Sequence, residues 1–210
     1  MQVSLAGAVR LSMQRTLNSM PTVRPSVKRS FYTGAMDTNP ALIEIAERLF
    51  YEQGYLATSM DTLARSARMS SRTLYKHAGS KAALVAEVLV ARDRRFFEQV
   101  DVLDVRSFFD ALAGWIGREG ARGCLFLRIL GETGGVEPAI VAAVQAHKAR
   151  LREHIARIVQ ADLGRADSVL AERIVLLFEG AVAASAWQGA SAIEAACGAA
   201  LDLVAAVRAA

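Results

Sequence analysis

A run of basic and hydroxyl side chains between residues 58 and 81 is the part of this chain best suited to chemistry, and that chemistry is phosphate binding. No acidic residue falls between Asp61 and Glu87. The interval contains these basic residues: Arg65, Arg68, Arg72, Lys76, His77 and Lys81. Cationic side chains without neighbouring carboxylates suit a surface that lies against a nucleic-acid backbone. The segment therefore predicts contact with DNA.

The apolar residues in this run predict two short helices joined by a tight turn. One buried helix face recurs at Met60, Leu63, Ala64 and Ala67. Thr58 or Ser59 can cap the first helix and Ser70 the second, because a hydroxyl accepts from the free N–H groups of a first turn. Leu74 faces inward, and the residues before it stand where recognition helices contact base edges. The pattern is a helix–turn–helix.

Further helices are predicted on both sides of this motif. Apolar periodicity and capping signals place them at 38–53, 80–99, 105–118, 122–131, 138–161, 167–188 and 191–208. With the two helices of the motif this makes nine, and the fold class is all-α. The composition agrees, since the chain is alanine-rich with 53% hydrophobic residues and only four prolines. Charges interrupt every apolar run before membrane-spanning length, so no transmembrane helix is expected.

The amino-terminal extension, residues 1–36, carries the excess charge of the chain. It contains five basic residues and no acid, so it is +5, and the other residues sum to −1 because the total is +4. Its prolines, serines and threonines predict an unstructured segment. Three interpretations stay open: a basic arm along DNA, a start annotated upstream of the true one at Met36, or a transit peptide.

The motifs Ala41–Ser70 and Ser70–Leu89 resemble the TetR family of bacterial transcriptional regulators. The family pattern is matched at Phe50, Gly54, Tyr55, Thr58, Thr73, Leu74, Tyr75, His77, Ser80 and Lys81. Two positions depart from it, because Arg68 stands where the family has glycine and Ala78 where it has phenylalanine. Arg68 is expected to carry backbone strain if the turn needs a positive φ. The resemblance covers about sixty residues.

The resemblance implies a division of labour along the chain. Residues 37–82 form the DNA-binding domain, and residues 83–210 form a helical domain for effector binding and dimerisation. The expected DNA-binding residues are Thr58, Ser70, Ser71, Arg72, Thr73, Tyr75, Lys76, His77 and Lys81. Of these, Ser71 and Arg72 are expected to contact bases, while Thr58, Tyr75 and Lys81 hold phosphates. A cytoplasmic protein that binds double-stranded DNA is expected.

Aromatic and small residues of the carboxy-terminal half suggest two further sites. The candidate ligand-binding residues are Phe108, Trp115, Phe126, Arg128, His147 and Phe178, with Glu179 as another polar anchor. The candidate dimer-interface residues are Gly180, Ala184 and Trp187, in a run of small residues that lets helices approach closely. Ordinary core packing is the alternative for each aromatic residue, and a tight intramolecular contact is the alternative for the small residues.

No catalytic constellation stands out, so an enzyme is not expected. The two cysteines, Cys124 and Cys197, are interpreted as buried thiols, with a redox sensor as the alternative. They form no metal-binding spacing with the histidines, and neither metal nor cofactor is expected. The favoured function is a homodimeric repressor that binds a palindromic operator and is released by a small, mostly apolar effector. A DNA-binding regulator without a ligand is the alternative, and an enzyme on a helical scaffold is a remote one.

Overall fold

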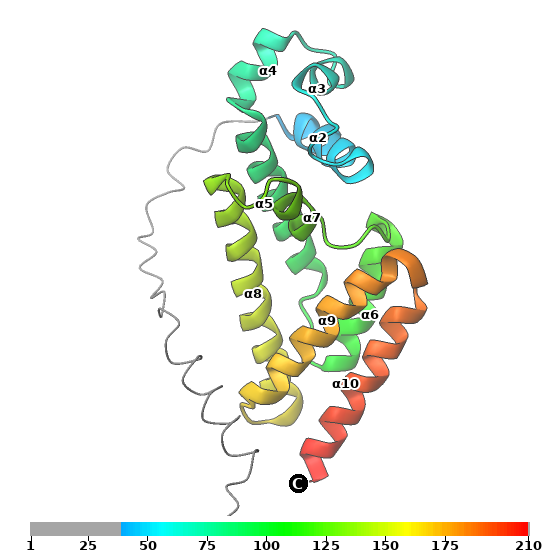
Figure 1. Ribbon diagram of the computed structural model, residues 1–210. Coiled ribbons are helices and arrows are strands. Elements are labelled where there is room, and N and C mark those ends of the chain that lie inside the picture. The colour runs from blue at the N-terminus through cyan, green and yellow to red at the C-terminus, as the bar shows by residue number, and fades with distance from the viewer. Residues whose placement is uncertain (1–38, 210) are drawn as a thin grey trace, which may run out of the picture. The chain divides into compact units, whose positions relative to one another are not determined.

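The computed structural model describes residues 39–209, which form nine helices and no strand (Figure 1). The helices are α2 (Pro40–Gln53), α3 (Met60–Ser66), α4 (Ser71–Ala78), α5 (Lys81–Gln99), α6 (Val105–Glu119), α7 (Leu125–Glu132), α8 (Pro138–Leu163), α9 (Ser168–Gln188) and α10 (Ser191–Ala209). The predicted all-α fold is confirmed. The predicted basic extension, residues 1–36, lies outside the described residues.

Local signals set most of the helix boundaries. Side-chain oxygens accept from the first-turn amides of six helices, at Asn39, Ser59, Ser70, Ser80, Asp104 and Asp167. The largest error of prediction is the start of α7, which begins at Leu125 and not at residue 122. Gly120 and Gly123 have φ angles of 93° and 76°, and a right-handed helix cannot contain such a backbone. Residues 120–124, the connector, therefore link α6 to α7 without helical structure.

The amino-terminal core is the buried apolar cluster that α2–α5 form together with α7 and the start of α8. Its aliphatic members from the first helices include Leu42, Leu63, Leu74 and Leu84. Leu125, Phe126 and Ile129 of α7 belong to the same cluster. Helix α7 therefore packs on the helix–turn–helix region, although the predicted boundary assigns it to the second domain. The boundary at residues 82 and 83 stays a prediction.

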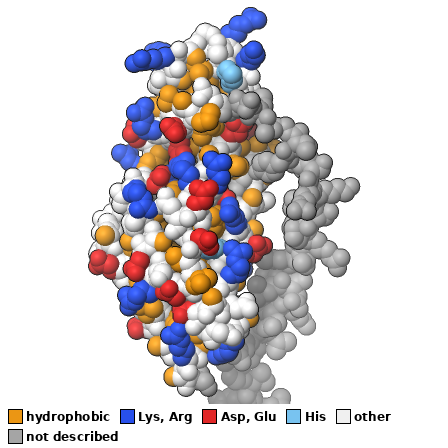
Figure 2. Space-filling model, turned by 180° about the vertical axis from the view of Figure 1, so that it is seen from behind, with side chains coloured by type: hydrophobic (Ala, Val, Ile, Leu, Met, Phe, Trp, Pro, Cys, Tyr) orange, Lys and Arg blue, Asp and Glu red, His pale blue; other side chains and the backbone are white. Residues whose placement is uncertain are grey.

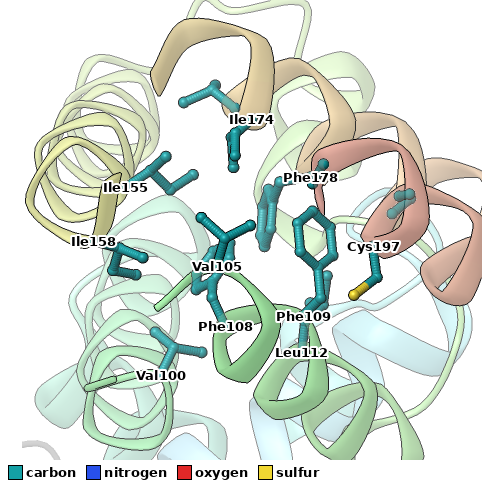
Figure 3. Packing of buried hydrophobic residues seen from close by; sticks show 14 of the residues in the cluster. Val100, Val105, Phe108, Phe109, Leu112, Ile155, Ile158, Ile174, Phe178 and Cys197 are labelled. Atoms are coloured by element: carbon teal, nitrogen blue, oxygen red, sulfur yellow. The ribbon is translucent and has the colours of Figure 1, made fainter. Parts of the chain in front are cut away.

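The carboxy-terminal core joins the second half of α5 to α6, α8, α9 and α10. Figure 3 shows Phe108 and Phe109 of α6 and Phe178 of α9 turned toward one another, with Val105 beside them. The rings of Phe108 and Phe178 have centroids 5.6 Å apart. Helices α9 and α10 lie side by side in Figure 1 and are in contact.

Helix α5 belongs to both cores. Leu84, Val85, Val88 and Leu89 pack in the amino-terminal core, and Phe96 and Phe97 pack in the carboxy-terminal core. The helix also lies against α2 and α8. A movement of α5 in one core therefore moves side chains of the other.

Candidate functional site

The turn between α3 and α4 holds the two helices of the motif together. Arg68 has a φ of 53°, the only positive value at a non-glycine among the described residues. The amide of Met69 then donates to the carbonyl of Ala64 at 3.0 Å, which closes the turn. Ser70 Oγ accepts from the Thr73 amide at 3.1 Å and starts α4. The turn does need a positive φ at Arg68, which is the condition under which strain was expected, and the predicted cap at Ser70 is confirmed.

Helix α4 presents polar side chains on one face and buries two apolar ones. Leu74 and Ala78 are buried in the amino-terminal core. The exposed residues at this helix are Ser70, Ser71, Arg72, Thr73, Tyr75 and Lys76, while His77 is half-buried. Among the described residues, no carboxylate forms an ion pair with Arg72 or Lys76. Figure 2 shows basic side chains and a histidine at the end that α3 and α4 form, with acidic side chains only farther along this face.

The hydroxyls of this surface are partly engaged within the motif. The Thr73 hydroxyl lies 2.8 Å from that of Ser70, which already caps the helix. Ser71 Oγ donates to Asp61 of α3 at 3.3 Å. These contacts fix the first turn of α4, in which Arg72 carries the exposed positive charge. The arrangement suits a helix whose first turn approaches base edges in a DNA groove.

Lys81, at the first position of α5, lies beside the motif and not on α4. Its ammonium group is 4.1 Å from the centre of the Tyr55 ring, a cation–π contact. Partial burial lowers the pKa of Lys81, and the nearby carboxylate of Glu132 opposes that shift. The ring thus orients the ammonium group while the side chain stays half-exposed.

The prediction that Thr58 holds a phosphate is wrong. Its exposed fraction is 0%, and its hydroxyl donates to the carbonyl of Gly54 at 2.7 Å. A hydroxyl that is buried and bonded to the backbone is not available to DNA. Ser59 caps α3 in its place, accepting from the Thr62 amide at 3.1 Å. Thr58 instead ties the end of α2 to the start of α3.

An aromatic cavity of about 40 Å³ lies between the two cores. Phe126 and Leu125 reach it from the amino-terminal core, and Phe96, Trp115 and Phe178 reach it from the carboxy-terminal core. The other lining residues are Arg92, Leu112, Ile116, Gly120, Gly123, Cys124, His147, Val182 and Ser185. The structure thus brings four of the six candidate ligand residues together: Trp115, Phe126, His147 and Phe178.

Two candidate ligand residues do not line this cavity. Phe108 is fully buried in the carboxy-terminal core, where it packs against Phe109 and Phe178. Arg128 points to α2, where its Nη1 donates to the carbonyl of Tyr51 at 3.1 Å. Phe126 and Arg128 lie on opposite faces of α7, and the face of Phe126 is the one that lines the cavity. Glu179 is also outside the lining and pairs with Lys148 at 2.6 Å.

His147 lines the cavity and is positioned by a ring stack and a hydrogen bond. Its ring stacks on Phe126 with centroids 3.8 Å apart, and its Nδ1 lies 2.7 Å from Oδ1 of Asp93. Burial lowers the pKa of His147, although the Asp93 carboxylate opposes the shift. Burial in turn raises the pKa of Asp93, but hydrogen bonds from His147 and Arg150 outweigh it and leave that pKa below its usual value. Nδ1 of the neutral imidazole therefore carries the proton that Asp93 accepts.

Near the end of α5, Arg92 is buried and lies between two carboxylates. Arg92 is only 6% exposed, and its Nη1 lies 2.6 Å from Glu47 of α2 and 3.0 Å from Glu119 of α6. Arg95 bonds to the same two carboxylates, at 2.7 and 3.4 Å. We call these four residues the arginine–glutamate cluster. The burial of Arg92 has a sequence signal, because this residue falls on the apolar stripe of α5, between Val88 and Phe96.

The connector forms one wall of the cavity and is hydrogen-bonded to Tyr51 at the end of α2. The Tyr51 hydroxyl donates to the carbonyl of Gly120 at 2.5 Å and accepts from the Arg122 amide at 2.9 Å. Gly120 itself lines the cavity, as do Gly123 and Cys124. A Cβ at Gly120 would lie only 3.1 Å from the Tyr51 ring, and the φ of 93° there is one that other residues rarely adopt. Cavity wall and α2 are thereby in direct contact.

The candidate dimer residues lie on α9. Gly180 is exposed, Ala184 is half-buried and Trp187 is 75% exposed. Leu176, one turn before Gly180 on the helix, is 65% exposed. Large apolar side chains in water are costly when they gather on one face. The face is available to a partner, and the described residues do not cover it.

Other chemistry finds less support in the described residues. Cys124 is half-buried and Cys197 is buried, both as free thiols, and burial raises the pKa of Cys197. No group of three or more metal-ligating side chains occurs in residues 39–209. None of the helices that the structure describes combines the length and apolar composition that a membrane crossing requires.

The motif and its buried faces define a helix–turn–helix protein, and comparison with known proteins specifies the family. Residues 42–88 match the family model described as bacterial regulatory proteins, tetR family. A comparison with curated proteins finds no match. The amino-terminal motif is thus that of the tetR family, and the fold is shared with solved TetR-family transcriptional regulators.

Solved structures support the fold over most of the chain. A TetR-family transcriptional regulator from Streptomyces coelicolor is 23% identical with a TM-score of 0.70, and the match covers 80% of this chain and 94% of that one. A TetR transcriptional regulator from Legionella pneumophila is 18% identical with a TM-score of 0.66, covering 79% and 97%. A regulator from Saccharomonospora viridis, solved in complex with choline, is 18% identical with a TM-score of 0.61, covering 79% and 94%.

Proposed function

We propose that the protein is a ligand-responsive transcriptional repressor that binds a palindromic operator as a homodimer. The observation that carries the proposal is the surface of α4. Its first turn exposes Ser71 and Arg72, its buried side is anchored by Leu74, and no carboxylate of the described residues pairs with Arg72 or Lys76. A helix fixed from behind and cationic in front can enter a DNA groove.

Within this surface, we assign different tasks to different side chains. Arg72 and Ser71 contact base edges, because they occupy the first turn of the recognition helix. Tyr75, Lys76 and Lys81 hold phosphates on either side. Ser70 and Thr73 shape the start of the helix through their paired hydroxyls, and His77 lies at its far end.

The dimer is proposed to form through α9 and α10. Leu176, Gly180 and Trp187 give α9 an exposed apolar face with little bulk at its middle. A two-fold interface uses the same patch on both subunits, and the resulting pair of α4 helices matches a palindromic site. Gly180→Arg is expected to convert the dimer to a monomer, and Glu153→Ala, an exposed change on α8 and outside the proposed interface, serves as the control. An unchanged dimer of Gly180→Arg in light scattering would place the interface elsewhere.

The effector is proposed to bind in the aromatic cavity. Its rings suit a mostly apolar molecule, but pockets for drug-sized ligands typically reach about 300 Å³ or more. At about 40 Å³ the cavity must widen to accept one. Widening separates the two cores, and α5 transmits the change to the spacing of the DNA-binding lobes. Choline in the Saccharomonospora viridis regulator supports a small-molecule site in a protein of this fold.

The test is to recover the DNA that the purified protein enriches from fragments of its own genome. We expect a palindromic sequence, bound by the full chain and lost or relaxed with Arg72→Ala. Enrichment without sequence preference would contradict an operator-binding regulator. The small cavity favours a second candidate, a DNA-binding regulator without an effector. A chemical screen that never changes operator affinity would support that candidate over the first.

A further inference from the structure

The charge of the aromatic cavity selects the kind of effector that it can bind. Of the described residues that line it, Arg92 is the one with a formal charge, since burial lowers the pKa of the His147 imidazole. The remaining lining side chains are apolar or aromatic, apart from Ser185 and Cys124. Ser185 already donates its hydroxyl to the carbonyl of Val182 at 2.8 Å. The guanidinium of Arg92 is therefore the charged group that a bound molecule meets in the lining, and the carboxylates of Glu47 and Glu119 that pair with it lie outside the lining.

Arg92 has hydrogen-bonding capacity left for a ligand. Guanidinium carries five N–H groups, and the hydrogen bonds of Arg92 to Glu47 and Glu119 both start from Nη1. No buried side-chain nitrogen of the described residues lacks a partner, so Nε and Nη2 of Arg92 keep accessible surface. Arg92 lines both the aromatic cavity and the charged cleft next to it, which reaches Glu44 and Arg118. Two nitrogens without a hydrogen bond, Nε and Nη2, thus belong to a residue that lines both spaces.

We propose that the effector is an organic acid, with an aromatic body between the rings and a carboxylate that binds Arg92. This inference rests on the proposed effector site and specifies its ligand. A planar fork of N–H groups matches a carboxylate in two parallel hydrogen bonds. The rings of Phe96, Trp115 and Phe178 surround the space that the apolar body would fill.

The same geometry argues against a quaternary ammonium ligand of the choline type. Aromatic rings can bind such a cation, but the guanidinium of Arg92 already lies 4.9 Å from the centre of the Trp115 ring. A second cation here would be next to the Arg92 guanidinium, and the nearby carboxylates of Glu47 and Glu119 already pair with Arg92 and Arg95. Burying an unpaired charge of that kind is costly. The effector of this chain is thus opposite in charge to the choline bound by the related regulator.

Binding of the acid would also loosen the hold on the DNA-binding helices. Glu47 belongs to α2, and its carboxylate is paired with Arg92 at 2.6 Å. A ligand carboxylate on Nε and Nη2 adds a negative charge beside Glu47 and weakens its bond to Nη1, while Arg95 remains paired with Glu47 at 2.7 Å. The contact between α2 and the cavity is then weakened without leaving Glu47 unpaired. Operator affinity should fall as the acid binds.

The test compares three probes that share an aromatic body: 4-phenylbutyrate, the neutral 4-phenylbutyramide and benzyltrimethylammonium. Affinities are measured by isothermal titration calorimetry with the full chain. The indole N–H resonance of Trp115, assigned with Trp115→Phe, locates the site. We expect the acid to bind about tenfold or more tightly than the amide, as a charge-assisted pair implies. The ammonium probe should not shift the Trp115 resonance.

Arg95 supplies the matched control. Arg95→Gln removes an arginine from the same two carboxylates but not from the cavity lining. We expect Arg92→Gln to abolish the preference for the acid and Arg95→Gln to keep it, with circular dichroism and melting temperature verifying that both variants fold. Arg92→Lys, which retains the charge but not the fork, should keep part of the preference if Arg92→Gln proves unstable.

Each outcome separates this inference from the proposed function. An amide or ammonium probe that binds at Trp115 as tightly as the acid would overturn the acid preference and leave an effector site in place. Acid binding that is unchanged in Arg92→Gln would overturn the role of Arg92. Absence of binding by all three probes would overturn this inference and count against the ligand-responsive part of the proposed function, while DNA binding would stand.

Discussion

The two apolar cores differ in what fills them and in what lies at their edges. The amino-terminal core is largely aliphatic, and Leu63, Leu74 and Leu84 are all fully buried. The carboxy-terminal core is rich in rings, with Phe96, Phe97, Phe108, Phe109, Trp115 and Phe178. Aliphatic side chains that interdigitate without gaps hold α4 in one position. Flat rings with a cavity beside them leave room for a change of packing.

Several charged and polar side chains lie at the boundary between the two cores. The arginine–glutamate cluster joins α2, α5 and α6 there, and Asp93 and His147 join α5 to α8. Helix α7 belongs to the first core yet supplies a cavity wall through Phe126. A ligand in the cavity is therefore next to both cores, and the boundary is where a change in one reaches the other.

The largest expected effect comes from breaking the cluster at this boundary. Glu47→Ala removes the closer carboxylate from buried Arg92, which keeps only Glu119. Loss of one partner of a buried ion pair costs about 3–5 kcal/mol, because the other charge stays desolvated. Denaturant unfolding should show a loss near the lower end of that range.

The control lies one turn earlier on the same helix. Glu44 is exposed, so Glu44→Ala should change the free energy of unfolding by less than about 0.5 kcal/mol. Equal effects of the two substitutions would mean that the cluster does not join the cores. Glu47→Gln, which keeps the shape and one acceptor, should fall between them.

A second test addresses the outer face of the amino-terminal core, where DNA is proposed to bind. Arg72→Ala should reduce operator affinity by about 1–3 kcal/mol and relax the preference at one position of each half-site. Lys81→Ala should weaken all sequences alike, because a phosphate contact carries no sequence information. Retained preference in a binding titration of Arg72→Ala would remove Arg72 from base recognition.

A third, smaller effect concerns strain at the turn of the motif. Arg68 holds a φ of 53°, which glycine adopts without steric cost. Arg68→Gly should therefore raise the free energy of unfolding by up to about 1 kcal/mol. Arg68→Ala removes the charge but keeps the strain, so it should give no such gain. A gain of equal size in both variants would point to charge and not to backbone strain.

Sequence alone predicted the motif well because its determinants are local. The caps at Ser70 and Ser80, buried Leu74 and the acid-free interval all fall within a few residues of one another. The cavity was predicted only in part, since the burial of Phe108 depends on how α6 meets α9. Glu47 and Arg92 are 45 residues apart in the chain, so no local spacing predicts the hydrogen bond between them. Thr58 was misjudged because its burial results from the packing of α2 on α3.

The smallest expected effect is a pH dependence that belongs to the carboxy-terminal core and its boundary. Burial lowers the pKa of both His147 and His154 from the ordinary 6.5. His154 Nε2 lies 2.7 Å from the carbonyl of Val100, and its Nδ1 lies 3.1 Å from Nη2 of Arg157. Nε2–H therefore donates and Nδ1 accepts, which is the neutral tautomer. Protonation of Nδ1 would break the bond with Arg157 and place two cations together.

Below pH 6.5 the unfolded chain therefore binds more protons than the folded one, and stability falls as the pH is lowered. Stability is therefore greatest well above pH 6.5 and declines as the pH falls through this value toward the lowered pKa of each folded histidine. His154→Gln, whose amide can still donate to Val100, should reduce the slope of unfolding free energy against pH in this window. His147→Asn, whose amide can donate to Asp93, should reduce this slope independently.

The lowered pKa of Asp93 adds a decline in stability only at more acidic pH, below its ordinary value of 3.8. An unchanged slope in the variant that lacks both histidines would show that neither imidazole is held neutral by the fold.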